Sequence, residues 1–98
     1  MGALAIAGAL VPHQVSVQFA QFAPAQVDVL PAETVVWTNV SPRQHTVTSG
    51  TDVFASGQLA AGSRFTWTFT GVGAYPYHCT VHPAMTGEIE RASCRERV

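Results

Sequence analysis

Residues 65–70, in an expected strand over 64–70, alternate between large aromatic and small hydroxyl side chains. Phe65, Trp67 and Phe69 occupy every second position, and a threonine follows each of them. Successive side chains of a β-strand point to opposite faces of a sheet, so this period of two predicts a strand with one core face and one solvated face. Val35 and Trp37 offer a matching inward pair from an earlier strand. The chain must therefore build a sheet whose inner face is covered.

Short alternating runs recur along the chain between turn residues, and no stretch from 13 to 90 has helical spacing long enough to predict a helix. Turn residues lie at 31–32, 41–42, 49–50, 61–62 and 71–73, at the close spacing of two packed antiparallel sheets. We expect an all-β Greek-key β-sandwich of about seven to eight strands. The expected strands are 15–19, 26–30, 34–38, 46–49, 64–70, 74–79 and 86–89. The segment 52–59 is expected to hold a helical turn or an edge strand.

The chain has 98 residues, enough for one domain with its own core, and we expect that domain to span residues 13–90. Only 11% of the residues are charged, the formal net charge is −1, and the five basic residues are all arginines that form no stripe along the expected domain. Nucleic-acid binding requires a cluster of cations, so nucleic acid is excluded as an expected partner. We expect a monomer.

Both ends of the chain differ from the part between them. Residues 1–12 are almost wholly apolar up to Val11, too short to span a bilayer, and are expected to be a signal-peptide remnant or an N-terminal extension; a first strand is the alternative. The tail 91–98 breaks the alternation that runs up to Ile89, so we expect it to lie outside the fold. Cys94 in this tail is expected to be foreign to the natural protein and unrelated to Cys79.

The segment 75–87 contains the side chains of this sequence that are most typical of a metal-binding site. Cys79, His82 and Met85 recur every third residue, a spacing that suits a tight loop closing around one point. In an extended strand Cys79 and His82 would point to opposite faces, so the chain must turn here. A thiolate, an imidazole and a weak thioether are the ligands that select copper in electron-transfer sites, and the trigonal plane needs a second imidazole.

His45 is the natural donor of that second imidazole, because it follows a loop at 41–44 and precedes an expected strand. Zinc is the competing metal, but methionine is a poor zinc ligand and structural zinc sites usually contain several cysteines. The sequence therefore predicts one copper ion held by His45, Cys79, His82 and Met85. His78 is expected at the surface or behind the ligands, and His13 is expected to be exposed.

The run from Tyr77 to Gly87 resembles the copper loop of the plastocyanin and amicyanin branch of the cupredoxins, and the resemblance covers about residues 14–90. It implies a type 1 blue-copper protein that shuttles one electron between a donor and an acceptor in transient encounters. It also implies an exposed edge of His82, with Pro83 and Ala84 beside it, as the partner-contact surface. Plastocyanins commonly place asparagine after the first histidine ligand, and this chain has Thr46 there, which leaves the hydrogen bond to the copper loop in doubt.

Of three other candidate functions for this chain, one is excluded and two remain open. A multicopper oxidase is excluded, because Thr80 stands where such enzymes have a second histidine and no His-x-His pair occurs. A cupredoxin module cut from a larger copper redox enzyme and a copper-delivery protein without redox work remain alternatives. We expect an electron carrier rather than an enzyme, without a membrane span in this chain, in the periplasm or another extracytoplasmic compartment.

Overall fold

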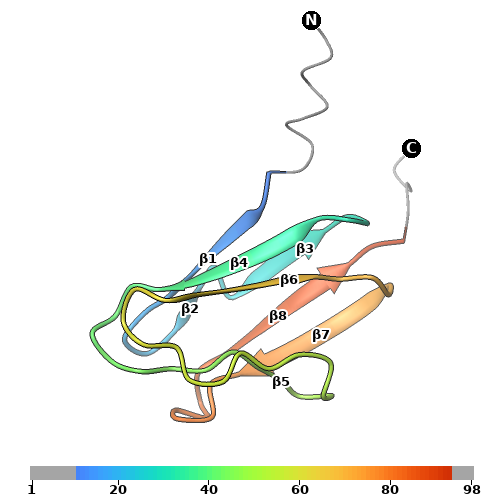
Figure 1. Cartoon of the computed structure of the whole chain (residues 1–98). Coiled ribbons are helices and arrows are strands. Elements are labelled where there is room, and N and C mark those ends of the chain that lie inside the picture. The colour runs from blue at the N-terminus through green and yellow to red at the C-terminus, as the bar shows by residue number, and fades with distance from the viewer. Residues whose placement is uncertain (1–10, 94–98) are drawn as a thin grey trace, which may run out of the picture.

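The computed structural model describes residues 11–93, which form eight strands and no helix (Figure 1). The strands are β1 (His13–Val17), β2 (Phe22–Ala23), β3 (Gln26–Val29), β4 (Thr34–Asn39), β5 (Thr48–Ser49), β6 (Arg64–Thr68), β7 (Gly73–His78) and β8 (Thr86–Arg91). None of the described segments forms a helix with the length and hydropathy needed to span a bilayer.

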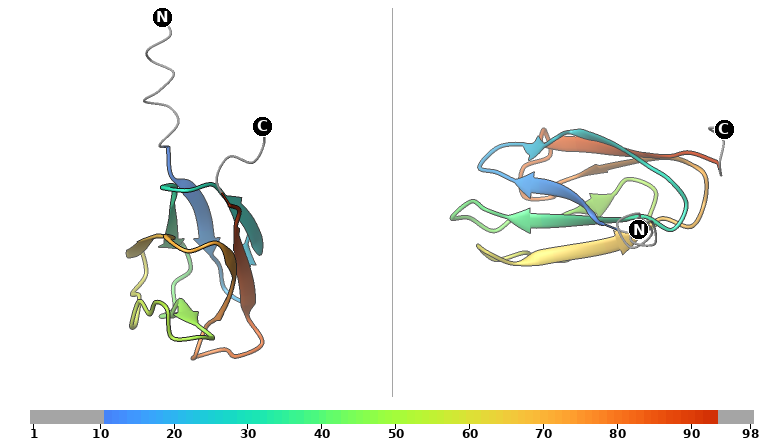
Figure 2. Two further views of the ribbon diagram at one scale, coloured as in Figure 1. Left: turned by 90° about the vertical axis from the view of Figure 1, so that its right-hand side faces the viewer. Right: turned by 90° about the horizontal axis from the view of Figure 1, so that it is seen from above.

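The strands form two four-stranded sheets that face each other, as the view from above shows (Figure 2). One sheet has the order β2-β1-β4-β6 and the other has the order β3-β8-β7-β5. Most neighbours are antiparallel, but β1 pairs with β4 and β3 pairs with β8 in parallel. The predicted all-β sandwich is confirmed.

The core lies between the sheets and follows the alternation of the strands. Val35 and Trp37 of β4 are wholly buried, and Val15 and Val17 of the neighbouring β1 lie on the same inner face. The Trp37 ring meets Tyr77 of the opposite sheet edge-on, with 5.4 Å between the ring centroids. Apolar burial of this kind is the main favourable term in folding, so these side chains hold the sheets together.

The aromatic face predicted for 64–70 is also confirmed, although the strand is shorter than expected. Phe69 is buried, while Phe65 and Trp67 are only partly buried and pack against the core. The three threonines between and after them are exposed. Burial is incomplete because β6 is the last strand of its sheet, with β4 on one side only.

β1 lies two residues earlier than the expected strand 15–19, and the other differences are at short or irregular segments. The two-residue strand β2 was not predicted, and β5 keeps only the second half of the expected run 46–49. The segment 52–59 contains no helical turn; it holds two isolated bridges, between His45 and Leu59 and between Thr48 and Ala55. Arg91, which the sequence analysis assigned to the tail, pairs with Gly73 as the last residue of β8.

The expected N-terminal extension falls outside the described residues apart from Val11 and Pro12, and Cys94 falls outside them as well.

Candidate metal centre

Three potential metal ligands meet at one end of the sandwich. The ligand atoms of His45, Cys79 and His82 all lie within 4.8 Å of one another, and Nδ1 of His45 is 3.6 Å from Sγ of Cys79. His45 and Cys79 are wholly buried, while His82 is partly exposed. Among residues 11–93 this is the one group of three or more histidine, cysteine or acidic side chains with metal-binding geometry.

The turn predicted between Cys79 and Met85 is present and closes on itself. β7 ends at His78 and β8 begins at Thr86, so the seven residues 79–85 connect two antiparallel neighbours. The Cys79 amide donates to the Met85 carbonyl at 3.1 Å, and the Met85 amide donates to the His82 carbonyl at 2.8 Å. These bonds bring the buried Met85 back to the base of the loop, next to Cys79.

His45 reaches the same place from a loop that is anchored by a buried asparagine. Asn39, at the end of β4, donates through Nδ2 to the carbonyls of Arg43 at 2.7 Å and Leu59 at 2.9 Å. Leu59 in turn exchanges two backbone hydrogen bonds with His45, at 3.2 and 2.7 Å. This role of Asn39 was not predicted from the sequence. The feature that could have indicated it is a polar residue at an inward-facing position at the end of a buried strand.

Thr46 ties the two halves of the centre together. Its hydroxyl accepts a hydrogen bond from the Thr80 amide at 2.8 Å, and its own amide donates to Sγ of Cys79 at 3.4 Å. The same hydroxyl lies 2.9 Å from the Thr48 hydroxyl and 3.2 Å from the Thr80 hydroxyl. The hydrogen bond to the loop that the sequence left in doubt is therefore made, by a threonine in place of asparagine.

The donor set fits a copper ion. Nδ1 of His82 is buried and has no hydrogen-bond partner in the described structure. Buried polar atoms are normally hydrogen-bonded, so this nitrogen is suited to bind a metal ion instead. Burial lowers the pKa of His45, and the nearby His82 and Arg43 lower it further, so the imidazole of His45 is neutral near pH 7. One thiol, two imidazoles and a thioether at the base of the loop match copper better than zinc.

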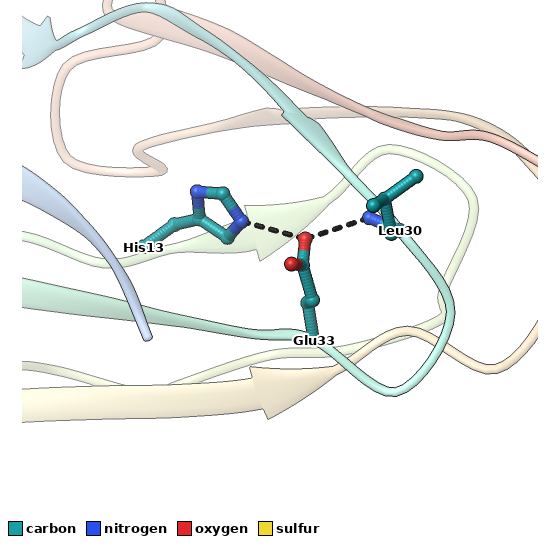
Figure 3. A network of polar contacts seen from close by, with 3 residues as sticks. All are labelled: His13, Leu30 and Glu33. Atoms are coloured by element: carbon teal, nitrogen blue, oxygen red, sulfur yellow. Dashed lines mark hydrogen bonds and ion pairs between the residues drawn. The ribbon is translucent and has the colours of Figure 1, made fainter. Parts of the chain in front are cut away.

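The other two described histidines lie away from this centre. His78 is half-buried on the outer face of its sheet, where it lines a shallow hollow with Pro76, Pro83 and Glu88. His13, for which the sequence suggested no partner, lies 2.8 Å from a carboxylate oxygen of Glu33 at the opposite end of the sandwich (Figure 3). Neither histidine belongs to the metal-binding group.

Residues 11–91 match the family model of copper binding proteins, plastocyanin/azurin family. Amicyanin from Paracoccus versutus is 29% identical over 80 residues, which cover 76% of this chain and 61% of the relative. This chain thus spans about three fifths of the length of that relative.

Two solved structures show the same fold over most of this chain. A novel purple cupredoxin from Nitrosopumilus maritimus has a TM-score of 0.76 at 24% identity, and the match covers 82% of this chain and 99% of that one. A copper-containing nitrite reductase from Thermus scotoductus has a TM-score of 0.76 at 27% identity, over 83% of this chain but only 22% of the enzyme.

Proposed function

Since this chain belongs to the plastocyanin/azurin family of copper-binding proteins, we propose that it carries single electrons between redox proteins by means of one type 1 copper ion. The observation that carries the proposal is the gathering of His45, Cys79 and His82 at one buried point. We assign these three side chains as the copper ligands and Met85 as the weak fourth ligand.

The ion supplies the chemistry when bound, because copper exchanges one electron between its two oxidation states. The chain's own residues hold the ligands in place and keep water away from them. Cys79 and His45 are wholly buried, and Thr46 joins their two loops by hydrogen bonds. A site whose ligands are fixed in advance changes little between oxidation states, which favours fast electron exchange.

His82 is the proposed exit for the electron, because it is the one proposed imidazole ligand with an exposed part. Pro83 and Ala84 follow it and are exposed, so we propose that His82, Pro83 and Ala84 contact the redox partners. Small apolar contacts suit brief encounters, which bury little area.

Reconstitution of the apoprotein with Cu(II) tests the proposal. We expect an intense blue or purple colour from the thiolate bond to copper, and we expect Cys79→Ser to abolish it. His78→Gln, a change in the adjacent but outward-facing side chain, should keep the colour. A colourless copper complex of the wild-type chain would leave the copper-delivery alternative instead.

The match to part of a nitrite reductase supports a second candidate, in which this domain is the electron-relay module of a larger copper enzyme. The reading frame of the complete gene separates the two. A stop codon soon after Glu90 supports a free carrier, and a second copper domain in the same frame supports the module.

We also propose an extracytoplasmic location, consistent with the apolar start of the chain. Fractionation of the native host followed by immunoblotting tests this, and recovery in the cytoplasmic fraction would contradict it.

A further inference from the structure

Charge is unevenly distributed between the two ends of the sandwich. We use the term site end for the loops 18–21, 24–25, 40–47, 59–63 and 79–85 together with Arg64, the first residue of β6. These residues include two arginines, Arg43 and Arg64, and no acidic residue. The five acidic residues of the described chain lie outside this set, at Asp28, Glu33, Asp52, Glu88 and Glu90, and Glu88 lines a hollow together with Pro83 of the site end.

The net charge does not reveal this asymmetry, because the formal net charge of the whole chain is only −1. The fold separates the charges by bringing five loops to one end, while β3 and β8 of the β3-β8-β7-β5 sheet carry three of the acidic residues (Figure 1). A protein with a positive end and a negative body is oriented by the field of a charged partner before contact.

Arg43 lies beside exposed apolar side chains. Its guanidinium is 4.8 Å from the centre of the Phe19 ring, and Phe19 is 58% exposed. Val40 is 59% exposed, and its amide bonds to the carbonyl of Val17, which holds the 40–43 loop against the end of β1. A cation held over an aromatic ring, with apolar neighbours, can pair with a carboxylate and bury area in one contact.

The two sides of the site end differ in sign. On the side of the β3-β8-β7-β5 sheet, Glu88 lines the shallow hollow together with Pro83 and His78. On the side of the β2-β1-β4-β6 sheet lie Phe19, Arg43 and Arg64. An anionic partner that contacts His82 is therefore favoured to extend over the second side rather than towards Glu88.

We propose that the surface formed by Phe19, Val40, Arg43 and Arg64 is the docking surface for a redox protein that presents carboxylates around an apolar contact area. This inference rests on the proposed electron-carrier function. It adds the sign of the partner's charge and the side of the site end on which the partner docks.

Oxidation of the Cu(I) protein by two small probes of opposite charge tests the sign. Hexacyanoferrate(III) and tris(phenanthroline)cobalt(III) each accept one electron, leaving the Cu(II) protein and the reduced probe, and stopped-flow absorbance follows the reaction. At low ionic strength we expect Arg43→Gln to slow the anionic probe by about two- to five-fold and to leave the cationic probe unchanged or faster. Added salt should remove most of this difference.

Arg91→Gln is the matched control, because it changes the net charge equally at the far end of β8. It should slow the anionic probe less than Arg43→Gln does. Equal effects of the two variants would overturn the inference, because they would report net charge alone. If neither probe reacts with the wild-type copper protein, the proposed function fails; if both react without a difference between the variants, only the docking surface fails.

A binding measurement that needs no electron transfer locates the surface. Hexacyanochromate(III) is a paramagnetic anion that broadens amide signals near its binding site, and it can be titrated into the isotope-labelled apoprotein or Cu(I) protein. We expect selective broadening at Phe19, Val40, Arg43 and Arg64, and none at Glu88 or Glu90. Broadening centred on the other side of the site end, or spread evenly over the protein, would overturn the proposed location.

Discussion

At the scale of single residues, Thr46 shows how a change of side chain can preserve a contact. A threonine hydroxyl is shorter than an asparagine amide, yet Oγ1 of Thr46 lies 2.8 Å from the Thr80 amide. Thr46 is buried, Thr80 is exposed, and the hydrogen bond between them is partly buried, so loss of the Thr46 hydroxyl leaves the Thr80 amide without its protein acceptor. One hydroxyl therefore fixes the distance between the loop of His45 and the loop of Cys79.

We expect Thr46→Val to destabilise the apoprotein by about 1–3 kcal/mol, because it leaves the Thr80 amide without its acceptor. Urea unfolding followed by tryptophan fluorescence measures the change. Thr46→Ser keeps the hydroxyl and should restore most of the stability. Thr48→Val removes only a hydroxyl contact and should cost less; an equal loss in Thr46→Val and Thr48→Val would contradict the role given to Thr46.

At the scale of elements, a glycine in β8 makes room for an aromatic ring of the neighbouring strand β7. Gly87 lies opposite Tyr77 in the pairing, and a Cβ atom added to Gly87 would overlap the ring of Tyr77. Tyr77 is buried, and burial raises its pKa to about 12, so the ring remains neutral in the core at ordinary pH. The glycine after the metal loop is thus required by packing.

We expect Gly87→Ala to destabilise the protein by about 1–3 kcal/mol, as overpacking of a filled core does. Gly50→Ala is the matched control, because a Cβ atom there meets only ordinary contacts, the nearest at 3.7 Å from the Pro76 carbonyl oxygen. Thermal unfolding of the two variants measures the difference. A Gly87→Ala variant as stable as Gly50→Ala would show that the Tyr77 ring can move aside.

A second contact between elements fastens β1 to the turn between β3 and β4. Glu33 accepts hydrogen bonds from the Leu30 amide and from His13, each at 2.8 Å (Figure 3). Burial raises the pKa of Glu33, but these two partners lower it by more, so the carboxyl has a pKa below its ordinary value of 4.5. Such a carboxyl stabilises the fold above its unfolded pKa and loses that contribution as the pH falls through its folded pKa.

We therefore expect the wild-type chain to lose more stability than Glu33→Gln as the pH falls from about 5 to about 3. The difference should stay below about 1 kcal/mol, because the pair is partly exposed. His13→Asn should lie between the two, since the Leu30 amide still lowers the pKa of Glu33. Urea unfolding at a series of pH values measures the slopes, and parallel slopes for wild type and Glu33→Gln would refute the prediction.

At the scale of the whole molecule, most of the core consists of side chains that are not proposed copper ligands. The hydrophobic cluster extends from Val15 to Ile89, and of its fifteen residues only Cys79 and Met85 are proposed ligands. We expect removal of copper by a chelator to leave the β-sheet circular dichroism intact and to lower the melting temperature, because metal binds the folded state alone. Loss of the β-sheet signal on copper removal would contradict this.

Much of this architecture was predictable from the sequence, because alternation fixes which side of a strand is buried. The aromatic face of 64–70 and the buried pair Val35 and Trp37 followed from period two alone. The strand β2 could not be predicted in this way, because two residues are too few to show an alternation. The expected strand at 46–49 was cut short because Thr46 serves the metal centre rather than a sheet.

The candidate site was predictable where its residues are close in sequence. The spacing of Cys79, His82 and Met85 indicated a loop around one point, and His45 was inferred from the loop before a strand. The anchoring of His45 through Asn39 was not predicted, because its acceptors on Leu59 and Arg43 become neighbours only in three dimensions. Pro83 and Ala84 as partner contacts remain a prediction.

The parallel pairing of β3 with β8 has a consequence for when the protein can acquire its metal. β8 is the last strand of the described residues 11–93, and it pairs with both β3, which begins at Gln26, and β7. Such distant pairings form late and slowly in folding. The ligand loop 79–85 is held between β7 and β8, so a growing chain cannot complete the copper pocket until β8 has been synthesised. The complete pocket is thereby available to a metal ion only after β8 has paired with β7.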